Sequence, residues 1–250
     1  MGSGNDIAKD AGDMILLDNS FASIVSAISE GRIIYDNIRR MLFYLLSTSL
    51  GEVLTMIGAL LVGLPLPVTA IMILWVNLVT DTALAIPLGL EPSEDDHMSR
   101  PPRRPNEPIL DRLMLTRIVL VGLAMALPTL VVFKYFIHFE YSLEYAQTIA
   151  FVMLVVSQWV NALNARSERL SAFRRAKVPN YHMLAGLCVA VILQVLVIFG
   201  PLKEVFNVAD VSINHLLISM ACVAIPVFAV VEIHKLKNKK TNPANMALVG

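Results

Sequence analysis

Six apolar runs, each about as long as a bilayer is thick, dominate this 250-residue sequence. A helix needs about 20 apolar residues to cross a hydrocarbon core that is about 30 Å thick. Because lipid offers no hydrogen-bond partners, each run must satisfy its own backbone and is predicted to be a helix. The sequence therefore predicts an all-α membrane protein, a bundle of six transmembrane helices. We place these helices at residues 41–62, 68–90, 113–136, 146–164, 183–201 and 213–233.

Composition agrees with a membrane protein and excludes one class of partner. Hydrophobic residues make up 56% of the chain and charged residues 16%, whereas soluble proteins have about 45–50% and about 25%. The formal net charge is zero, so overall charge gives no case for nucleic-acid binding. We expect the lipid bilayer as a partner, and no nucleic acid.

The basic residues predict how the chain is oriented. Cytoplasmic loops of membrane proteins carry an excess of Lys and Arg. With six crossings, 18 of the 20 lysines and arginines fall on one side, and only Lys134 and Lys203 fall on the other. We therefore expect a multi-pass protein with both termini in the cytoplasm. Separately from this charge pattern, we expect it in the plasma membrane. The larger set is Lys9, Arg32, Arg39, Arg40, Arg100, Arg103, Arg104, Arg112, Arg117, Arg166, Arg169, Arg174, Arg175, Lys177, Lys235, Lys237, Lys239 and Lys240.

Three regions divide the chain. Residues 1–40 are polar and mixed and are expected to lie outside the membrane. Residues 41–236 form the predicted transmembrane domain, and residues 237–250 form a cytoplasmic tail. Between the second and third helices, the segment from Glu91 to Asp111 is rich in proline and charge, so we predict an exposed loop there.

Two acidic residues lie inside predicted membrane helices. An acidic group at the centre of such a helix costs about 2.5–3.5 kcal/mol, so each one is a functional hypothesis. Glu52 lies midway along the first helix, with Ser49 three residues before it, and Asp81 lies midway along the second, near Asn77 and Thr80. Residues three or four apart share a helix face, and a short turn must pack these two helices antiparallel. Carboxylate, amide and hydroxyl oxygens suit a group I or group II cation.

Further polar residues leave alternatives open. The carboxyl groups could instead be protonated, or could form hydrogen bonds that hold helices together. Gly51, Gly58 and Pro87 favour a cation site, because broken helices free backbone carbonyls that can line a cavity. On the fourth helix Gln158, Asn161 and Asn164 form a stripe that could add neutral oxygens or serve only packing. Glu232, near the end of the sixth helix, is expected to be a solvated interface charge.

Several motifs, in order along the chain, resemble the calcium-transporting P-type ATPases. The segment LWVNLVTD at 74–81 resembles their sixth membrane helix, and GEV at 51–53 with GLP at 63–65 resembles their fifth. RPPR at 100–103 resembles the loop after the sixth helix, and NALN at 161–164 resembles the eighth. Residues 1–18 are similar to the last strand of the α/β phosphorylation domain, of which the N-terminus would be a short cytoplasmic remnant.

The resemblance assigns roles position by position. It implies cation ligands at Glu52 on the fifth helix and at Asn77, Thr80 and Asp81 on the sixth. Ser49 stands where the family offers an amide, and Gln158 stands where two-site calcium pumps offer a carboxylate. These two departures argue for one calcium ion rather than two, while sodium and potassium stay possible.

The resemblance also implies parts that these residues do not contain. The phosphorylated aspartate motif, the magnesium-binding segment, the nucleotide domain and the first four membrane helices have no counterpart in the 250 residues. We therefore expect the C-terminal membrane half of a pump, with Mg and ATP bound only by the missing head, and leave open whether the chain acts as an enzyme. The alternatives are a stand-alone passive cation-conducting or accessory membrane protein, a sodium/potassium-type pump half and, less favoured, a secondary transporter.

Overall fold

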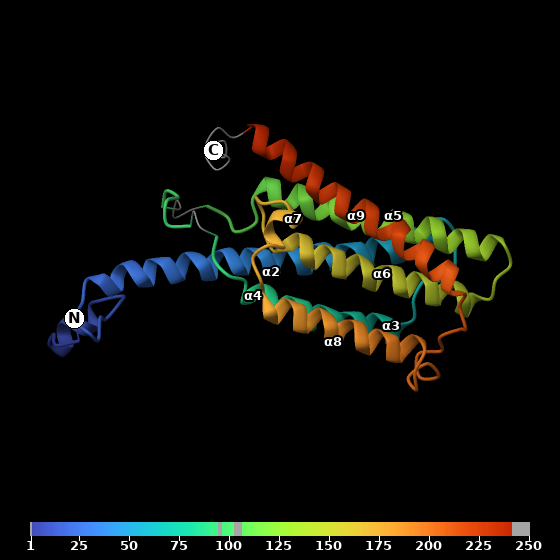
Figure 1. Cartoon of the computed structure of the whole chain (residues 1–250), viewed down its shortest axis with the longest axis horizontal. Coiled ribbons are helices and arrows are strands. Elements are labelled where there is room, and N and C mark those ends of the chain that lie inside the picture. The colour runs from blue at the N-terminus through green and yellow to red at the C-terminus, as the bar shows by residue number, and fades with distance from the viewer. Residues whose placement is uncertain (1, 95–96, 103–106, 242–250) are drawn as a thin grey trace.

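The structure, a computed structural model, describes residues 2–94, 97–102 and 107–241 and is helical, with no strand in those residues. Within these residues, six helical spans are long and apolar enough to cross a membrane, which confirms the predicted six-helix membrane fold (Figure 1). The elements are α1 (Asp6–Asp10), α2 (Ala22–Leu61), α3 (Ala70–Trp75), the π-helix η1 (Val76–Thr80), α4 (Asp81–Gly89), α5 (Arg112–His138), α6 (Leu143–Ala165), α7 (Ala172–Arg175), α8 (Tyr181–Ile198) and α9 (Ile213–Thr241). The spans are α2, the continuous α3–η1–α4, α5, α6, α8 and most of α9.

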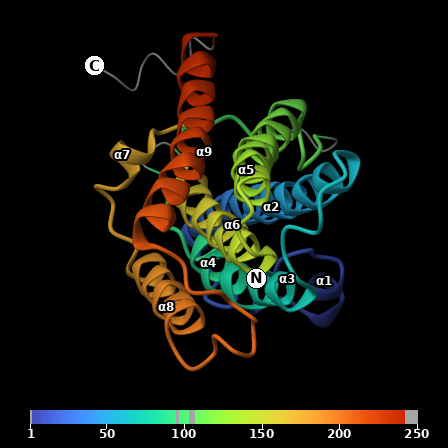
Figure 2. The same cartoon turned by 90° about the vertical axis from the view of Figure 1, so that its right-hand side faces the viewer.

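Helix α6 lies at the centre of the bundle. In the apolar window of this helix 83% of residues are buried, against 28% for α8 and for α9. Figure 2 looks along the bundle and shows α6 surrounded by α2, α4, α5 and α9. Since α6 is apolar or polar but uncharged from Ala146 to Ala165, it can be enclosed on all sides without burying a charge.

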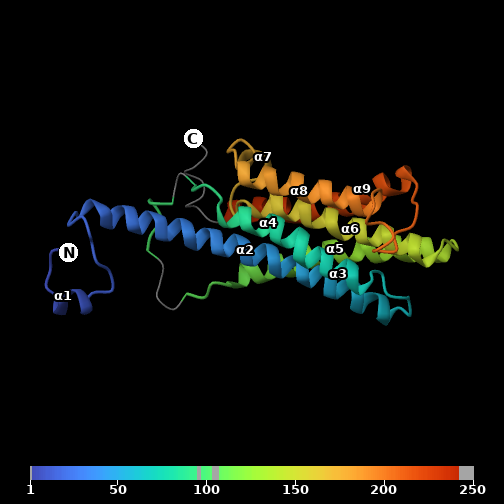
Figure 3. The same cartoon turned by 90° about the horizontal axis from the view of Figure 1, so that it is seen from below.

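Helix α2 is one unbroken helix of 40 residues. Its first half is polar and extends beyond the other helices, as Figure 3 shows; we call this end of the bundle the stalk end and the opposite one the far end. The glycines Gly51 and Gly58 do not break it, contrary to the expectation. Their missing side chains instead admit α5, because a Cβ at Gly51 would lie 2.8 Å from Sδ of Met125 and one at Gly58 would overlap Leu130.

The second span, α3–η1–α4, contains an irregular turn. Five residues, Val76–Thr80, adopt π-helical hydrogen bonding between the α-helical segments α3 and α4. A π-helical turn inserts one extra residue, which shifts the side chains that follow to another face, and such turns are frequent at functional sites. The shift falls directly before Asp81, whereas Pro87, the break expected from sequence, is tolerated inside α4.

The N-terminal residues do not form the strand that the resemblance implied. Residues 2–21 contain the short helix α1 and turns, with the backbone N–H of Gly2 donating to the carbonyl of Leu16 at 2.6 Å. A strand needs a neighbour to accept its ladder of hydrogen bonds, and none of the described residues offers one. That residues 1–40 are a remnant of a phosphorylation domain therefore stays a prediction, and residues 242–250 of the predicted tail lie outside the described part of the chain.

The start of the segment from Glu91 to Asp111 is buried, so the predicted exposed loop is partly wrong. Glu91 is 1% exposed and Glu94 is 8% exposed. The Glu91 carboxylate accepts hydrogen bonds from Arg166 (3.0 Å), Arg175 (2.9 Å) and Asn180 (2.6 Å), all in or next to the connection between α6 and α8. Burial is possible because the charge of this carboxylate is paired and its oxygens accept hydrogen bonds. Residues 98–99 and 101–102 are exposed, as predicted.

Candidate cation site

Glu52 joins three helices midway along the bundle. Its carboxylate is buried and accepts one hydrogen bond on each oxygen, from Asn77 (3.1 Å) in η1 and from Gln158 (2.8 Å) in α6. Both donors are neutral amides, so the negative charge of an ionised Glu52 has no cationic partner among these contacts. A cation would supply the missing positive charge.

Asp81 lies close enough to Glu52 for the two carboxyl groups to interact electrostatically. Its side chain is 5% exposed, and Oδ1 has no hydrogen-bond partner among the described residues. The fully buried hydroxyl of Tyr44 also lacks a partner of good hydrogen-bond geometry among the described residues, but it lies close enough to the Asp81 carboxyl, as the hydroxyl of Thr48 does, to interact with it. A buried acceptor without a donor costs about 1–3 kcal/mol, which binding of a cation would recover.

The other predicted ligands divide by exposure. Thr80 is 2% exposed and precedes Asp81 directly. Asn77 is exposed on one side while its amide bonds Glu52 and the carbonyl of Ile73. Ser49 is exposed and is not drawn into the hydrogen bonds around Glu52 in the described residues. The structure thus joins Glu52, Asn77 and Gln158 by hydrogen bonds and leaves Ser49 on an open face.

The polar stripe of α6 carries a row of unpaired acceptors. Gln158, Asn161 and Asn164 are each at most 1% exposed. Each amide nitrogen donates a hydrogen bond, to Glu52 (2.8 Å), to Ser47 (2.8 Å) and to the carbonyl of Val227 (3.4 Å). Each amide oxygen, however, has no partner among the described residues. The amide nitrogens of the stripe therefore hold helices together, which is one of the two roles expected from sequence. Its amide oxygens stay available to a cation.

The donor set has a definite chemistry. It contains two carboxylates, with hydroxyl and amide oxygens around them, and no sulfur or imidazole. No group of three or more His, Cys, Asp or Glu side chains that could hold a metal ion occurs in the described residues. Hard oxygen donors with two negative charges match Ca²⁺ or a similar s-block cation, whereas a soft transition metal such as Cu⁺ would favour sulfur ligands.

Ion pairs at the stalk end fix the helices that carry these oxygens. Glu94 accepts from Arg40 of α2 (3.0 Å), from Arg100 (3.0 Å) and from the hydroxyl of Ser167 just after α6 (2.7 Å). Together with the contacts of Glu91, this network ties α2, α4, α6 and α8 at one end. The Glu232 carboxylate is also more enclosed than predicted, with its side chain 13% exposed and bonded to the backbone N–H of Ala172 (2.9 Å).

Sequence reasoning missed Tyr44 and the buried ion pairs. Tyr44 stands four residues before Thr48 and eight before Glu52, a helical spacing that could have placed it on the site's face. The partners of Glu91 are 75 to 89 residues away along the chain, so local patterns carry no signal for them.

Comparison with known proteins decides the family. The family profile described as cation transporting ATPase, C-terminus, matches residues 65–237. This chain belongs to that family of cation-transporting ATPases. It is 39% identical over 228 residues to a calcium-transporting ATPase of Bacillus subtilis (strain 168), which covers 90% of this chain and 26% of that protein.

Two further relatives of this cation-transporting ATPase chain carry related names. Calcium-transporting ATPase 1 of Lactococcus lactis subsp. lactis (strain IL1403) is 37% identical over 83% of this chain and 24% of that protein. Probable cation-transporting ATPase F of Mycobacterium tuberculosis (strain ATCC 25618 / H37Rv) is 34% identical over 84% of this chain and 23% of that protein. The chain spans about a quarter of the length of these relatives, and its matched region is a membrane cation-transport domain.

Proposed function

We propose that this chain is the calcium-binding membrane half of an ATP-driven pump. The observation that carries the proposal is the meeting of Glu52 and Asp81 with unpaired oxygens between α2, α4 and α6. Glu52, Asn77, Thr80 and Asp81 bind the ion, and Ser49 and Gln158 act as auxiliary ligands. The names of the Bacillus and Lactococcus relatives favour calcium over sodium or potassium.

The hydrogen bonds around Glu52 suit a site that fills and empties. The amide nitrogens of Asn77 and Gln158 donate to the two oxygens of the Glu52 carboxylate. A rotation of either amide would turn its oxygen toward an arriving cation in place of the nitrogen. With two carboxylates the site neutralises one divalent ion, so we expect one calcium per cycle.

The pump is incomplete without a head that phosphorylates itself. ATP and Mg²⁺ bind to that head, which together with four further membrane helices forms the partner of this chain. The open face bearing Ser49 and Asn77 is where one of those helices would pack. The distribution of basic residues supports placing both termini in the cytoplasm, so the stalk end is cytoplasmic.

A chimera tests this proposal. The matching C-terminal region of the Bacillus subtilis calcium-transporting ATPase is replaced by this chain, and inside-out vesicles are assayed for ATP-driven uptake of radioactive calcium. We expect uptake by the chimera, and its loss by at least tenfold in Glu52→Gln and Asp81→Asn, because each variant removes one of two ligand charges. Glu144→Gln changes an exposed acid at the far end and should leave uptake unchanged.

Three results would overturn the proposal. Both carboxylate variants could keep the calcium affinity of the unmodified chimera. The chimera could fold, as judged by its thermal transition, and transport sodium or potassium instead. The chain alone in liposomes could conduct calcium down its gradient without ATP, which is the passive alternative.

A further inference from the structure

The connection between α6 and α8 presents a basic and aromatic surface at the stalk end. Exposed side chains on it include Arg169, Arg174 and Lys177, with Phe173 and Tyr181 about three-quarters exposed. No Asp or Glu occurs between Glu168 and Glu204. We call Arg174, Lys177 and the ring of Phe173 the basic hairpin surface.

Internal contacts hold this surface in place. Arg175, which lies between Arg174 and Lys177, points inward and is 2% exposed, with Nε 2.9 Å from the Glu91 carboxylate. The hydroxyl of Ser171 caps α7 through the backbone N–H of Arg174, and the N–H of Ala172 donates to Glu232. Arg175 therefore anchors the connection, and its neighbour Arg174 is left exposed.

The contacts of Phe173 set the depth of the surface. Its ring packs edge-to-face on Phe228 of α9, with ring centroids 5.4 Å apart. Phe228 lies inside the membrane span of α9, and the span of α8 begins at Tyr181. An exposed aromatic ring that reaches a spanning helix is typical of the interfacial layer, where rings enter the lipid and basic groups meet the headgroups.

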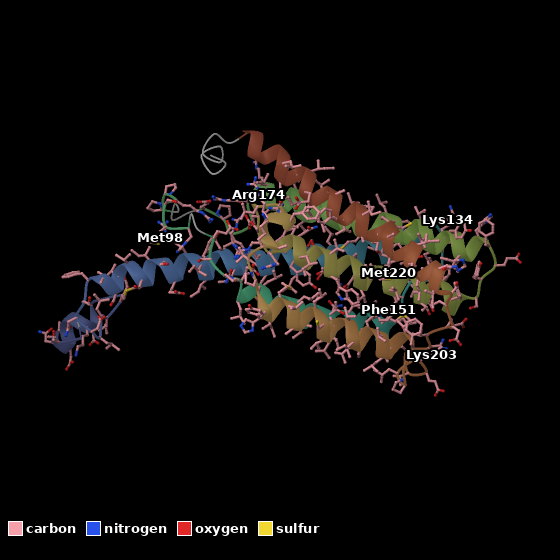
Figure 4. All side chains as sticks on the ribbon, viewed as in Figure 1. Met98, Lys134, Phe151, Arg174, Lys203 and Met220 are labelled. Atoms are coloured by element: carbon pink, nitrogen blue, oxygen red, sulfur yellow. The ribbon has the colours of Figure 1, made fainter. Side chains whose placement is uncertain are left out.

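The two ends of the bundle differ in whether an acidic residue accompanies the basic ones. Figure 4 places Arg174 at the end where the loop with Met98 lies, and Lys134 and Lys203 at the opposite end. Lys203 is paired with Asp210 at 2.5 Å, whereas the segment that holds Arg174 and Lys177 contains no acid of its own.

From this placement we infer that the basic hairpin surface binds the headgroup phosphate of an anionic phospholipid. Arg174 and Lys177 meet the phosphate from the protein side, while Phe173 enters the acyl region beside Phe228. Each Lys or Arg near an anionic bilayer surface contributes about 1 kcal/mol, which is about a fivefold change in affinity. Removing both charges should therefore weaken binding about twenty-fivefold. A zwitterionic phosphatidylcholine lacks the net charge and should bind no better here than to the rest of the surface.

The test titrates the whole chain in detergent with phosphatidylglycerol or phosphatidylcholine of equal acyl length and follows bound lipid by native mass spectrometry. We expect phosphatidylglycerol to bind at least tenfold more tightly than phosphatidylcholine. The double variant Arg174→Gln/Lys177→Gln should abolish that preference, and the matched pair Lys134→Gln/Lys203→Gln should retain it. Phe173→Ala should weaken phosphatidylglycerol binding but keep a preference for it over phosphatidylcholine, because it changes apolar contact and not charge.

Two outcomes would overturn the inference. The double variant could keep its preference for phosphatidylglycerol, or the matched pair at the far end could lose as much. A third arm adds soluble glycerol phosphate: displacement of phosphatidylglycerol at equal concentration would mean that a free phosphate is bound and not a membrane lipid. Equal thermal transitions of all variants ensure that lost binding is not lost folding.

Discussion

The side-chain amide of Gln158 donates a 2.8 Å hydrogen bond to Oε1 of Glu52, across 106 residues of sequence and between two membrane helices. The central helix α6 thereby holds the carboxylate that faces Asn77 from the other side. The amide is neutral, so the contact orients Glu52 without cancelling its charge.

Replacing this amide by an acid tests how charge controls the site. In Gln158→Glu two carboxylates would lie within hydrogen-bonding distance, and like charges so close cannot both ionise without cost. We expect the calcium-free chain to lose about 1–3 kcal/mol of stability, and calcium to raise its melting temperature more than that of the unmodified chain. Thermal unfolding in detergent with and without calcium measures both.

The control for that variant is Gln194→Glu. Gln194 is buried in α8 and accepts a hydrogen bond from Trp75 at 3.2 Å, and it is not one of the two amides that bond Glu52. Gln194→Glu should destabilise the chain, and calcium should raise its melting temperature no more than that of the unmodified chain. An equal calcium response in the two variants would contradict a cation site at Glu52.

The close contact of α8 with α4 depends on a glycine. A Cβ at Gly186 would overlap the backbone carbonyl of Ala83, two residues after Asp81. Backbone atoms cannot move aside as a flexible side chain can, so Gly186→Ala should cost at least about 1–3 kcal/mol and should also weaken calcium binding. Calorimetry and calcium titration in detergent check the two effects.

A second glycine serves as the control. Gly31, in the part of α2 that extends from the bundle, has no neighbouring atom within 4 Å of the position that an added Cβ would occupy. Gly31→Ala should stabilise the helix by up to about 1 kcal/mol, since alanine is the better helix former. Equal destabilisation by both substitutions would refute the packing argument.

Breaking the buried network at the stalk end should be costly. Glu91→Gln leaves Arg166 and Arg175, which are 7% and 2% exposed, without their shared anion. Removing one partner of a buried ion pair costs about 3–5 kcal/mol. Asp210→Asn removes the partner of Lys203 in an ion pair whose acid is 98% exposed, and it should cost at most about 1 kcal/mol. Chemical denaturation of both variants would show whether this order holds.

Acid should weaken the start of α5. Burial alone would raise the pKa of Asp111, but hydrogen bonds from the backbone N–H of Met114 and from Arg39 outweigh it and hold this pKa below its usual value. A group with a lowered pKa stabilises the fold above its unfolded pKa, about 3.9, and loses that contribution as the pH falls through the folded pKa. Asp111→Asn should therefore be less stable than the unmodified chain at pH 7, by up to about 1 kcal/mol.

The difference between the two proteins should vanish once the pH is well below about 4, where both side chains are neutral. Thermal unfolding at several pH values follows it. Asparagine can still cap the helix through its side-chain oxygen, so the variant removes the charge of Asp111 and keeps the cap. If the stability difference between the two proteins did not change with pH, the charge of Asp111 would contribute nothing.

How far the sequence predicts this molecule depends on which forces act locally. The six spans and the importance of Glu52 and Asp81 follow from one rule, that lipid excludes charge and unpaired backbone. The contacts of Glu91 with Arg175, 84 residues apart, depend on which loops meet, and no local pattern encodes that. For the same reason the sequence wrongly predicted that the start of the Glu91–Asp111 segment is exposed.

The helix irregularities show a second limit. Gly51, Gly58 and Pro87 suggested broken helices, yet the irregular turn lies at Val76–Thr80, where no glycine or proline occurs. A π-helical turn depends on how neighbouring helices pack, whereas the glycines are used for close approach to α5. Tyr44 was missed because a tyrosine in an apolar run resembles an ordinary core residue until its buried hydroxyl is seen beside Asp81.

The continuity of α2 has a mechanical consequence. From Ala22 to Glu52 the chain rises about 1.5 Å per residue, or about 45 Å, in one unbroken helix. A rod of that length turns a tilt of about 5° at one end into a displacement of about 4 Å at the other, comparable to the width of an ion-coordination shell. The second span, interrupted at η1, can absorb such a movement locally. Force applied outside the membrane would therefore move Glu52 relative to Asp81, instead of moving both together.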